Sequence, residues 1–193
     1  MKTVYKIVLL LLLCSFHSSG NISARKVRAK LYTSKTIDPK LYLAIRDKAK
    51  ELYNIRVVFG GKFNYPSKSE NGYIAEALIK KLNKKRGKQE YAIGITDQDI
   101  IRIRMWDVLD LTFTVDTILG FTDNPANTCI VSYARLKDSN TFNRTVNVVM
   151  HEMGHIMGLD HCEDGDCLMI PRDHLDSDML CYRCRCKLKR RKQ

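Results

Sequence analysis

The sequence predicts an α+β fold, in which a twisted mixed sheet packs with helices and a small cysteine-rich C-terminal subdomain follows. Strand-like and helix-like stretches intermingle up to about residue 158, which is typical of a sheet covered by helices. A long amphipathic helix pattern begins near Asn143 and contains a cluster of histidines. Five of the seven cysteines follow residue 161. We therefore expect an upper part up to about residue 158, a lower part after it, and a cleft between them.

Residues 1–20 have the features of a secretory signal peptide. Lys2 and Lys6 precede the uncharged run 7–13, which is too short to span a bilayer as a helix. Small residues follow, and cleavage after Gly20 would leave residues 21–193 as one domain of ordinary size. The sequence thus predicts an exported protein, secreted or periplasmic.

Two further features bear on location and partners. Cys14 suggests a lipid anchor as an alternative, although the large residue Leu13 before it disfavours lipoprotein processing. The net charge of +12 comes mostly from dispersed basic residues, which indicates solubility and gives no reason to expect nucleic acid as a partner. No later stretch is apolar enough to span a membrane, and we expect a monomer. The basic run Lys187–Lys192 is predicted to be a disordered, solvated end.

The elements before the histidine cluster follow from periodicity and from helix start signals. Asp38 and Pro39 mark a helix start, and Ser67–Glu70 fits a capping box for a second helix. The expected helices span 39–53 and 73–85, and the expected strands span 30–33, 55–59, 91–95, 111–115 and 128–133.

The stretch 151–162 reads H-E-x-x-H-x-x-G-x-x-H-C. His151 and His155 stand four residues apart, so on a helix their rings share one face and can bind one Zn²⁺. Glu152 beside them is the candidate general base. Gly158 suits a left-handed turn at the helix end, which can bring His161 back as a third ligand. Three protein ligands leave a fourth position for water, as in catalytic zinc sites.

The helix around this motif has an apolar stripe on the side opposite the two histidines. One face can then pack on a core while the other presents ligands to a cleft, which makes a chance match on an ordinary helix the poorer interpretation. The stripe consists of Val146, Val149, Met150, Met153, Ile156 and Met157.

The cysteines allow two interpretations. An even number of cysteines in an exported protein suggests disulfides, and six remain once Cys14 is removed. Short paired spacings, however, suit a tetrahedral zinc site with four sulfur ligands. These spacings are Cys162-x4-Cys167 and Cys181-x2-Cys184-x-Cys186, and Cys129 stands apart from them.

The motif through Cys162 resembles the metzincin metallopeptidases, and its continuation Cys167-Leu168-Met169 and Cys181-x-x-Cys184 resembles the archaemetzincins. The resemblance covers most of residues 30–186 and implies a metzincin-like domain with two zinc ions. It implies that His151, His155 and His161 hold a catalytic zinc and that Glu152 is the base. It implies that Cys162, Cys167, Cys181 and Cys184 hold a structural zinc, and that Met169 forms the methionine turn.

This chain departs from the family pattern in two places. The spacer between Met169 and Cys181 is several residues shorter, and Cys186 is an extra candidate ligand, so the choice of the last two cysteine ligands stays open. Some metzincins place a tyrosine after the methionine turn as an oxyanion partner. Here Ile170 and Pro171 follow, and His174 is a conceivable substitute that also fits an ordinary surface histidine.

These observations predict a zinc-dependent peptidase that cleaves peptide or protein substrates with a zinc-activated water and Glu152 as general base. The stretch Thr128–Tyr133 is either the edge strand that pairs with an extended peptide or an ordinary core strand. The alternative function is a non-enzymatic, zinc-stabilised binding module that uses its basic surface. The presence of Glu152 argues against it, because metal binding alone does not need that carboxylate.

Overall fold

The computed structural model describes residues 28–66, 68–107, 112–171 and 176–190. The predicted signal peptide of residues 1–20, Cys14 and His174 lie outside these ranges. Among the residues described, no helix is both long enough and apolar enough to cross a membrane.

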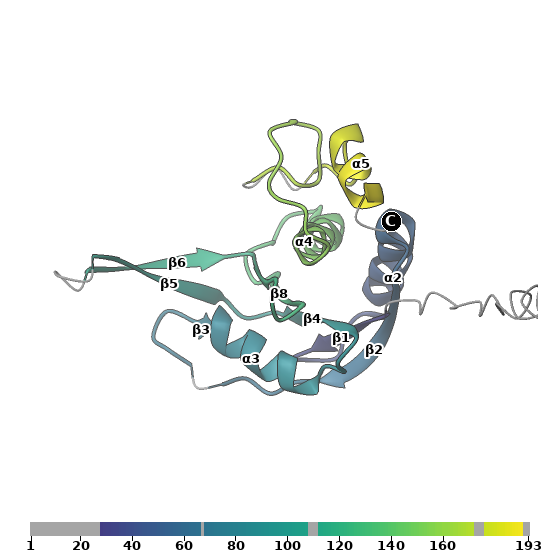
Figure 1. Ribbon diagram of the computed structural model, residues 1–193. Coiled ribbons are helices and arrows are strands. Elements are labelled where there is room, and N and C mark those ends of the chain that lie inside the picture. The colour runs from purple at the N-terminus through teal and green to yellow at the C-terminus, as the bar shows by residue number, and fades with distance from the viewer. Residues whose placement is uncertain (1–27, 67, 108–111, 172–175, 191–193) are drawn as a thin grey trace, which may run out of the picture.

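The centre of the fold is a five-stranded sheet with the order β2-β1-β4-β8-β7 (Figure 1). The first four strands are parallel, and β7 runs antiparallel to β8. The strands span Arg28–Thr33 (β1), Arg56–Lys62 (β2), Glu90–Thr96 (β4), Gly120–Asp123 (β7) and Thr128–Ser132 (β8). The twisted mixed sheet predicted from the sequence is confirmed.

Helices cover both faces of this sheet. The helices α2 (Pro39–Tyr53) and α4 (Thr141–Ile156) lie on one face, and α3 (Ala75–Lys85) lies on the other (Figure 1). Successive side chains of a strand therefore enter two different cores: Ile93 packs toward α2 and α4, whereas Ala92 packs toward α3. All five residues of β8 are buried, as expected for a strand covered on both faces.

A second, three-stranded sheet has the order β3-β5-β6. Its strands are Tyr73–Ile74 (β3), Ile100–Asp107 (β5) and Thr112–Ile118 (β6), and the β5–β6 hairpin projects away from the body of the molecule (Figure 1). The sequence predicted part of β6 but neither β5 nor β7.

The helix start signals succeeded for α2 and failed for α3. The carboxylate of Asp38 accepts a hydrogen bond from the Lys40 amide at 2.8 Å, so α2 begins at Pro39 as predicted. Ser67 of the expected capping box Ser67–Glu70 lies outside the described residues, and the helix start predicted there is wrong, because residues 68–74 form no helix. The Ser69 hydroxyl instead donates to the carbonyl of Gly72, and this turn leads into β3, so that α3 begins only at Ala75.

Of the two interpretations of 128–133, the ordinary core strand is confirmed and the substrate-binding edge is wrong. Strand β8 pairs with β4 on one side and β7 on the other, so it is a central strand. The edge of the sheet on this side is β7, which pairs with no other strand in the described chain.

The basic C-terminal end is not disordered up to Arg190. Helix α5 (Tyr182–Arg190) continues past Cys186, and Leu188 is only 5% exposed within the core beneath it. Cys184 and Leu188 stand four residues apart and are both buried, so one face of α5 docks on the body while its lysines and arginines face solvent.

Candidate active site and metal centres

His151 and His155 lie one turn apart on α4 with their rings converging. Their Nε2 atoms are 3.1 Å apart, and each Nδ1 lies 2.8 Å from a backbone carbonyl, that of Leu168 for His151 and that of Leu159 for His155. Because carbonyls only accept, each Nδ1 donates its proton outward and leaves Nε2 with a free lone pair. Burial lowers the pKa of His151 to about 4 and also lowers that of His155. Both rings are thus neutral, which is the form that binds a metal.

The helix ends in a left-handed turn that returns His161 to the other two rings. Gly158 has φ of 79°, and the Leu159 amide donates to the Gly154 carbonyl at 2.9 Å. The ring centroid of His161 lies 4.8 Å from that of His155 and 5.3 Å from that of His151.

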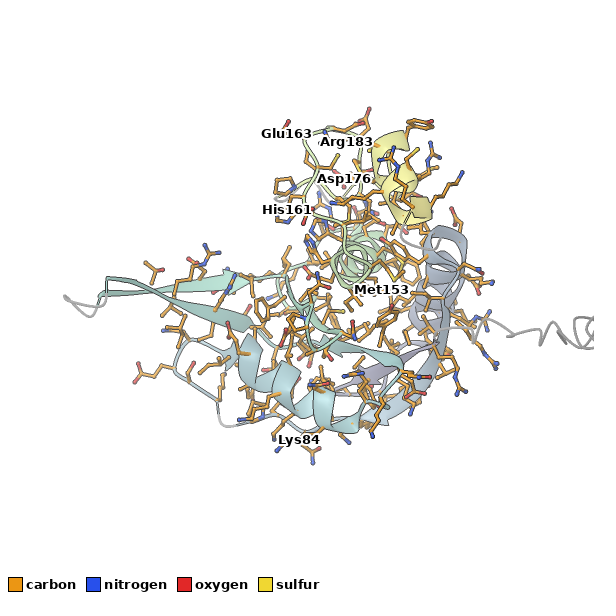
Figure 2. The ribbon with its side chains drawn as sticks, viewed as in Figure 1. Lys84, Met153, His161, Glu163, Asp176 and Arg183 are labelled. Atoms are coloured by element: carbon orange, nitrogen blue, oxygen red, sulfur yellow. The ribbon has the colours of Figure 1, made fainter. Side chains whose placement is uncertain are left out.

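These three imidazoles suit a zinc ion. One nitrogen from each ring lies within 4.8 Å of the others. Nitrogen ligands about 2.0–2.1 Å from a tetrahedral zinc lie about 3.3 Å apart, close to the 3.1 Å between the first two. His161 is exposed, so the side of the group away from α4 opens to solvent, and Figure 2 shows it at the rim above that helix.

Glu152 is buried between α4 and the edge strand β7, with 7% of its surface exposed. The Thr122 hydroxyl donates to its Oε2 at 2.5 Å. Its Oε1 lies over Gly120, where an added Cβ would come within 2.3 Å of it. Burial raises the pKa of Glu152 to about 7, while the hydrogen bond from Thr122 opposes this rise. The carboxylate therefore has the basicity that suits a group accepting a proton at neutral pH.

Met169 forms a floor beneath α4. It is fully buried, and a Cβ on Gly154 would lie 2.3 Å from its Sδ. The Tyr53 hydroxyl, at the end of α2, donates to the carbonyl of Met150 at 2.7 Å and fixes α2 against the same helix. The segment that carries the histidines is thus held from below by a methionine and from the side by a tyrosine.

Four cysteines gather in the lower part of the molecule. The Sγ atoms of Cys162 and Cys181 lie 3.7 Å apart, and those of Cys167 and Cys184 lie 3.7 Å apart. The two sulfur atoms of a disulfide are about 2.05 Å apart. Four sulfur ligands at about 2.3 Å from a tetrahedral zinc are about 3.8 Å apart from one another. The Sγ atoms of all four cysteines lie within 4.8 Å of one another, and Cys186 does not belong to this group. The donor set fits zinc with four thiolate ligands.

The two groups are adjacent in the chain and in space. Cys162 directly follows His161, and its amide donates to the carbonyl of Met169 at 2.8 Å. The amide of Met169 in turn lies 3.5 Å from the Sγ of Cys167. The loop that carries the third histidine is therefore tied to the four-cysteine group.

The profile of Peptidase family M54 matches residues 32–190 of the chain. The chain belongs to this family.

Two curated proteins that are similar to this chain are archaemetzincins. The archaemetzincin of Methanopyrus kandleri is 32% identical over 106 residues, which are 53% of this chain and 55% of that protein. The archaemetzincin of Thermococcus kodakarensis is 30% identical over 123 residues, which are 59% of this chain and 54% of that protein. Each match thus spans about half the length of the curated relative.

Solved structures extend the likeness to the whole fold. The M. kandleri archaemetzincin superposes with a TM-score of 0.71 at 25% identity, covering 86% of this chain and 96% of that one. A zinc-dependent peptidase from Methanocorpusculum labreanum gives a TM-score of 0.66 at 22% identity, covering 83% of this chain and 99% of that one. The archaemetzincin-like fold predicted from the motif is confirmed.

The sequence did not point to Gly120 or Thr122, the two residues that contact Glu152 from the edge strand. They lie in a four-residue strand with no detectable periodicity, and their contact with the motif spans about 30 residues of chain. Tyr53 was also missed, because a buried tyrosine at a helix end has no motif.

Proposed function

We propose that this protein is a zinc-dependent peptidase in which His151, His155 and His161 hold the catalytic zinc. The observation that carries the proposal is the open group of three imidazoles with a buried carboxylate on the same helix. Membership of a peptidase family supports it. When bound, the zinc would polarise the scissile carbonyl and acidify the attacking water.

Glu152 would act as the proton carrier. Its carboxylate would take a proton from the attacking water and then deliver that proton to the leaving amine. Thr122 fixes Oε2 and Gly120 leaves room for Oε1, so both oxygens are confined by β7. This confinement keeps the carboxylate in one position through both transfers.

The substrate would be an extended peptide that pairs with the free edge of β7. This strand forms the wall directly beside Glu152, and it has a strand partner on one side only among the described residues. Main-chain pairing with such an edge is a general way to hold a peptide whose sequence varies.

The four cysteines would hold a second, structural zinc, giving two zinc ions per chain. The 3.7 Å sulfur separations support this arrangement over the disulfide alternative. A metal count on purified protein, with and without reductant, tests it. Two zinc ions in both conditions are expected, whereas one zinc ion together with cysteines oxidised in pairs would refute the second site.

The proposal includes the assembly of the mature protein. Residues 1–20 would direct export and be removed, and residues 21–193 would act as one monomeric catalytic domain. Intact-mass analysis of the exported protein tests the cleavage, and sedimentation tests the monomer.

The decisive experiment replaces Glu152 with glutamine, which keeps the shape and removes the base. We expect zinc content to stay unchanged and kcat/KM on a peptide to fall by about 10²-fold or more. Glu163→Gln is the matched control, because this exposed carboxylate lies in the nearby loop (Figure 2). Near-normal cleavage by zinc-loaded Glu152→Gln protein would exclude the mechanism. Absence of cleavage by the native protein would favour the non-enzymatic binding module.

A further inference from the structure

The edge strand beside Glu152 is part of a much longer stretch. Strand β6 is followed by β7 after a single residue, Leu119, at which the chain bends. Its partner changes along the way: Ile118 pairs with Ile100 of β5, whereas Gly120 pairs with Val131 of β8. The Leu119 carbonyl accepts from the Ser132 amide at 2.7 Å, so pairing is not interrupted at the change.

The end of β8 contacts the chain on both sides of the hairpin. The Ser132 hydroxyl donates to the Gln98 carbonyl at 2.7 Å, while the Ser132 amide bonds Leu119. The end of β8 is therefore hydrogen-bonded both to Gln98, just before β5, and to Leu119, just after β6. The opposite edge of residues 112–123 faces no strand within the ranges that the structure describes.

This free edge has no lysine or proline, two of the residues that usually protect an edge strand. Natural edges are blunted by lysine, proline or a bulge, because a long free edge invites pairing with other chains. The other outer strand, β2, begins with Arg56 and ends with Lys62, and both β2 and β6 pair with their neighbours through a register shift. The sequence of 112–123, TFTVDTILGFTD, contains no lysine, arginine or proline.

The hairpin also exposes apolar side chains beside this edge. Val115 is 45% exposed and lies opposite Ile103, which is 43% exposed, so the two form an apolar pair on one face. The other face is charged, with an ion pair between Arg104 and Asp116 at 3.2 Å. The side chains of a peptide added to β6 would also alternate between the two faces, so every second one would lie on the apolar face that contains Val115.

We infer that the free edge of β6 is an extended docking strand for the part of the substrate that lies C-terminal to the scissile bond. The inference rests on the proposed function. Antiparallel pairing is more stable than parallel pairing. A peptide that pairs antiparallel with β7 runs from Asp123 toward Gly120, so its part C-terminal to the cleaved bond continues past Leu119 onto β6. Val115 precedes Gly120 by five residues, which corresponds to about 16 Å of strand. The preferred substrate is therefore a long, unfolded segment with an apolar residue about four to six positions after the cleaved bond.

A peptide length series tests this surface. One series keeps the N-terminal side constant and places two to eight residues after the cleaved bond, and a second series extends only the N-terminal side. We expect kcat/KM to rise about tenfold or more as the C-terminal side grows from three to six residues, because several main-chain hydrogen bonds are added. Equal gains in both series, or no gain in the first, would overturn the inference.

Two changes separate docking from catalysis. Val115→Glu should abolish the gain from long peptides while short peptides are cleaved as before. Val115→Thr keeps the β-branched shape and replaces Val115→Glu in this test if that variant folds poorly. Leu43→Glu is the matched control, since Leu43 is 42% exposed on α2. N-methylation of alternate amides in positions four to six should remove the gain for one phase of the alternation only. If N-methylation removes the gain from long peptides in neither set of alternate positions, strand pairing is contradicted.

Failure of the proposed function gives a different result. If no peptide is cleaved, the function falls, and docking is then measured as fluorescence anisotropy of labelled long and short peptides with zinc-loaded Glu152→Gln protein. At least tenfold tighter binding of the long peptide supports the docking strand, and equal affinities overturn it.

Discussion

Replacing Gly120 with alanine tests whether the edge strand positions the proposed catalytic carboxylate. The added Cβ would lie 2.3 Å from Oε1 of Glu152 and 2.7 Å from its Cδ and Cγ. The carboxylate would have to move by about 1.1 Å to reach an ordinary contact of 3.4 Å. It is buried and held by Thr122 on its other oxygen, so this movement disturbs its alignment. A displacement of about 1 Å in an active site costs about 10²-fold in rate.

The assay is steady-state cleavage of one peptide, with zinc content and thermal unfolding measured on the same preparation. We expect kcat to fall about 10²-fold, with KM within a few-fold and zinc retained. Gly165→Ala is the control, because a Cβ there meets nothing within 4 Å. A kcat close to that of the native protein for Gly120→Ala, or an equal loss for the control, would refute the positioning role of β7.

Three further changes test the lower part of the molecule and its packing against α4. Cys162→Ser should lose the second zinc and weaken retention of the catalytic zinc during dialysis against a chelator, because His161 is the preceding residue; unchanged retention would contradict the coupling. Leu188→Ala should lower the free energy of unfolding by about 2–5 kcal/mol in urea titrations, since this side chain is buried; a value near zero would mean that α5 is not docked. Gly154→Ala should lower the free energy of unfolding by up to about 2 kcal/mol, because overpacking on Met169 costs about 1–3 kcal/mol and the better helix propensity of alanine offsets about 1 kcal/mol. An unchanged melting temperature would show that the methionine yields freely.

Features fixed by neighbours in sequence were predictable. Helix α2 has the predicted bounds because Asp38 and Pro39 act on the first turn beside them. The three histidines gather because helical spacing and the left-handed Gly158 dictate it. The four cysteines also gather as expected, and their role as ligands stays a prediction.

Features fixed by contacts between distant segments were not predictable in the same way. The position of β8 in the middle of the sheet depends on β7, whose four residues have no strand signal, so the sequence could not decide between an edge and a central position for β8. For β5 a signal existed, because Ile and Arg alternate from Ile101 to Arg104 with the period of a strand. The docked end of α5 also had a sequence signal, because Leu188 follows Cys184 by four residues and so lies on the same helix face. The density of positive charge in this stretch concealed that signal.

The lower part of the molecule has little regular backbone of its own. Beyond Ile156 the described residues contain the nine-residue helix α5 and no strand. Ordering such loops costs about 1–2 kcal/mol of conformational entropy per residue, and few main-chain ladders offset it. If the four thiolates bind zinc as proposed, metal binding contributes directly to the folding of this part. Metal supply would then govern the lifetime of the protein, because chains made without zinc would expose residues 157–190 to degradation while the sheet stays folded.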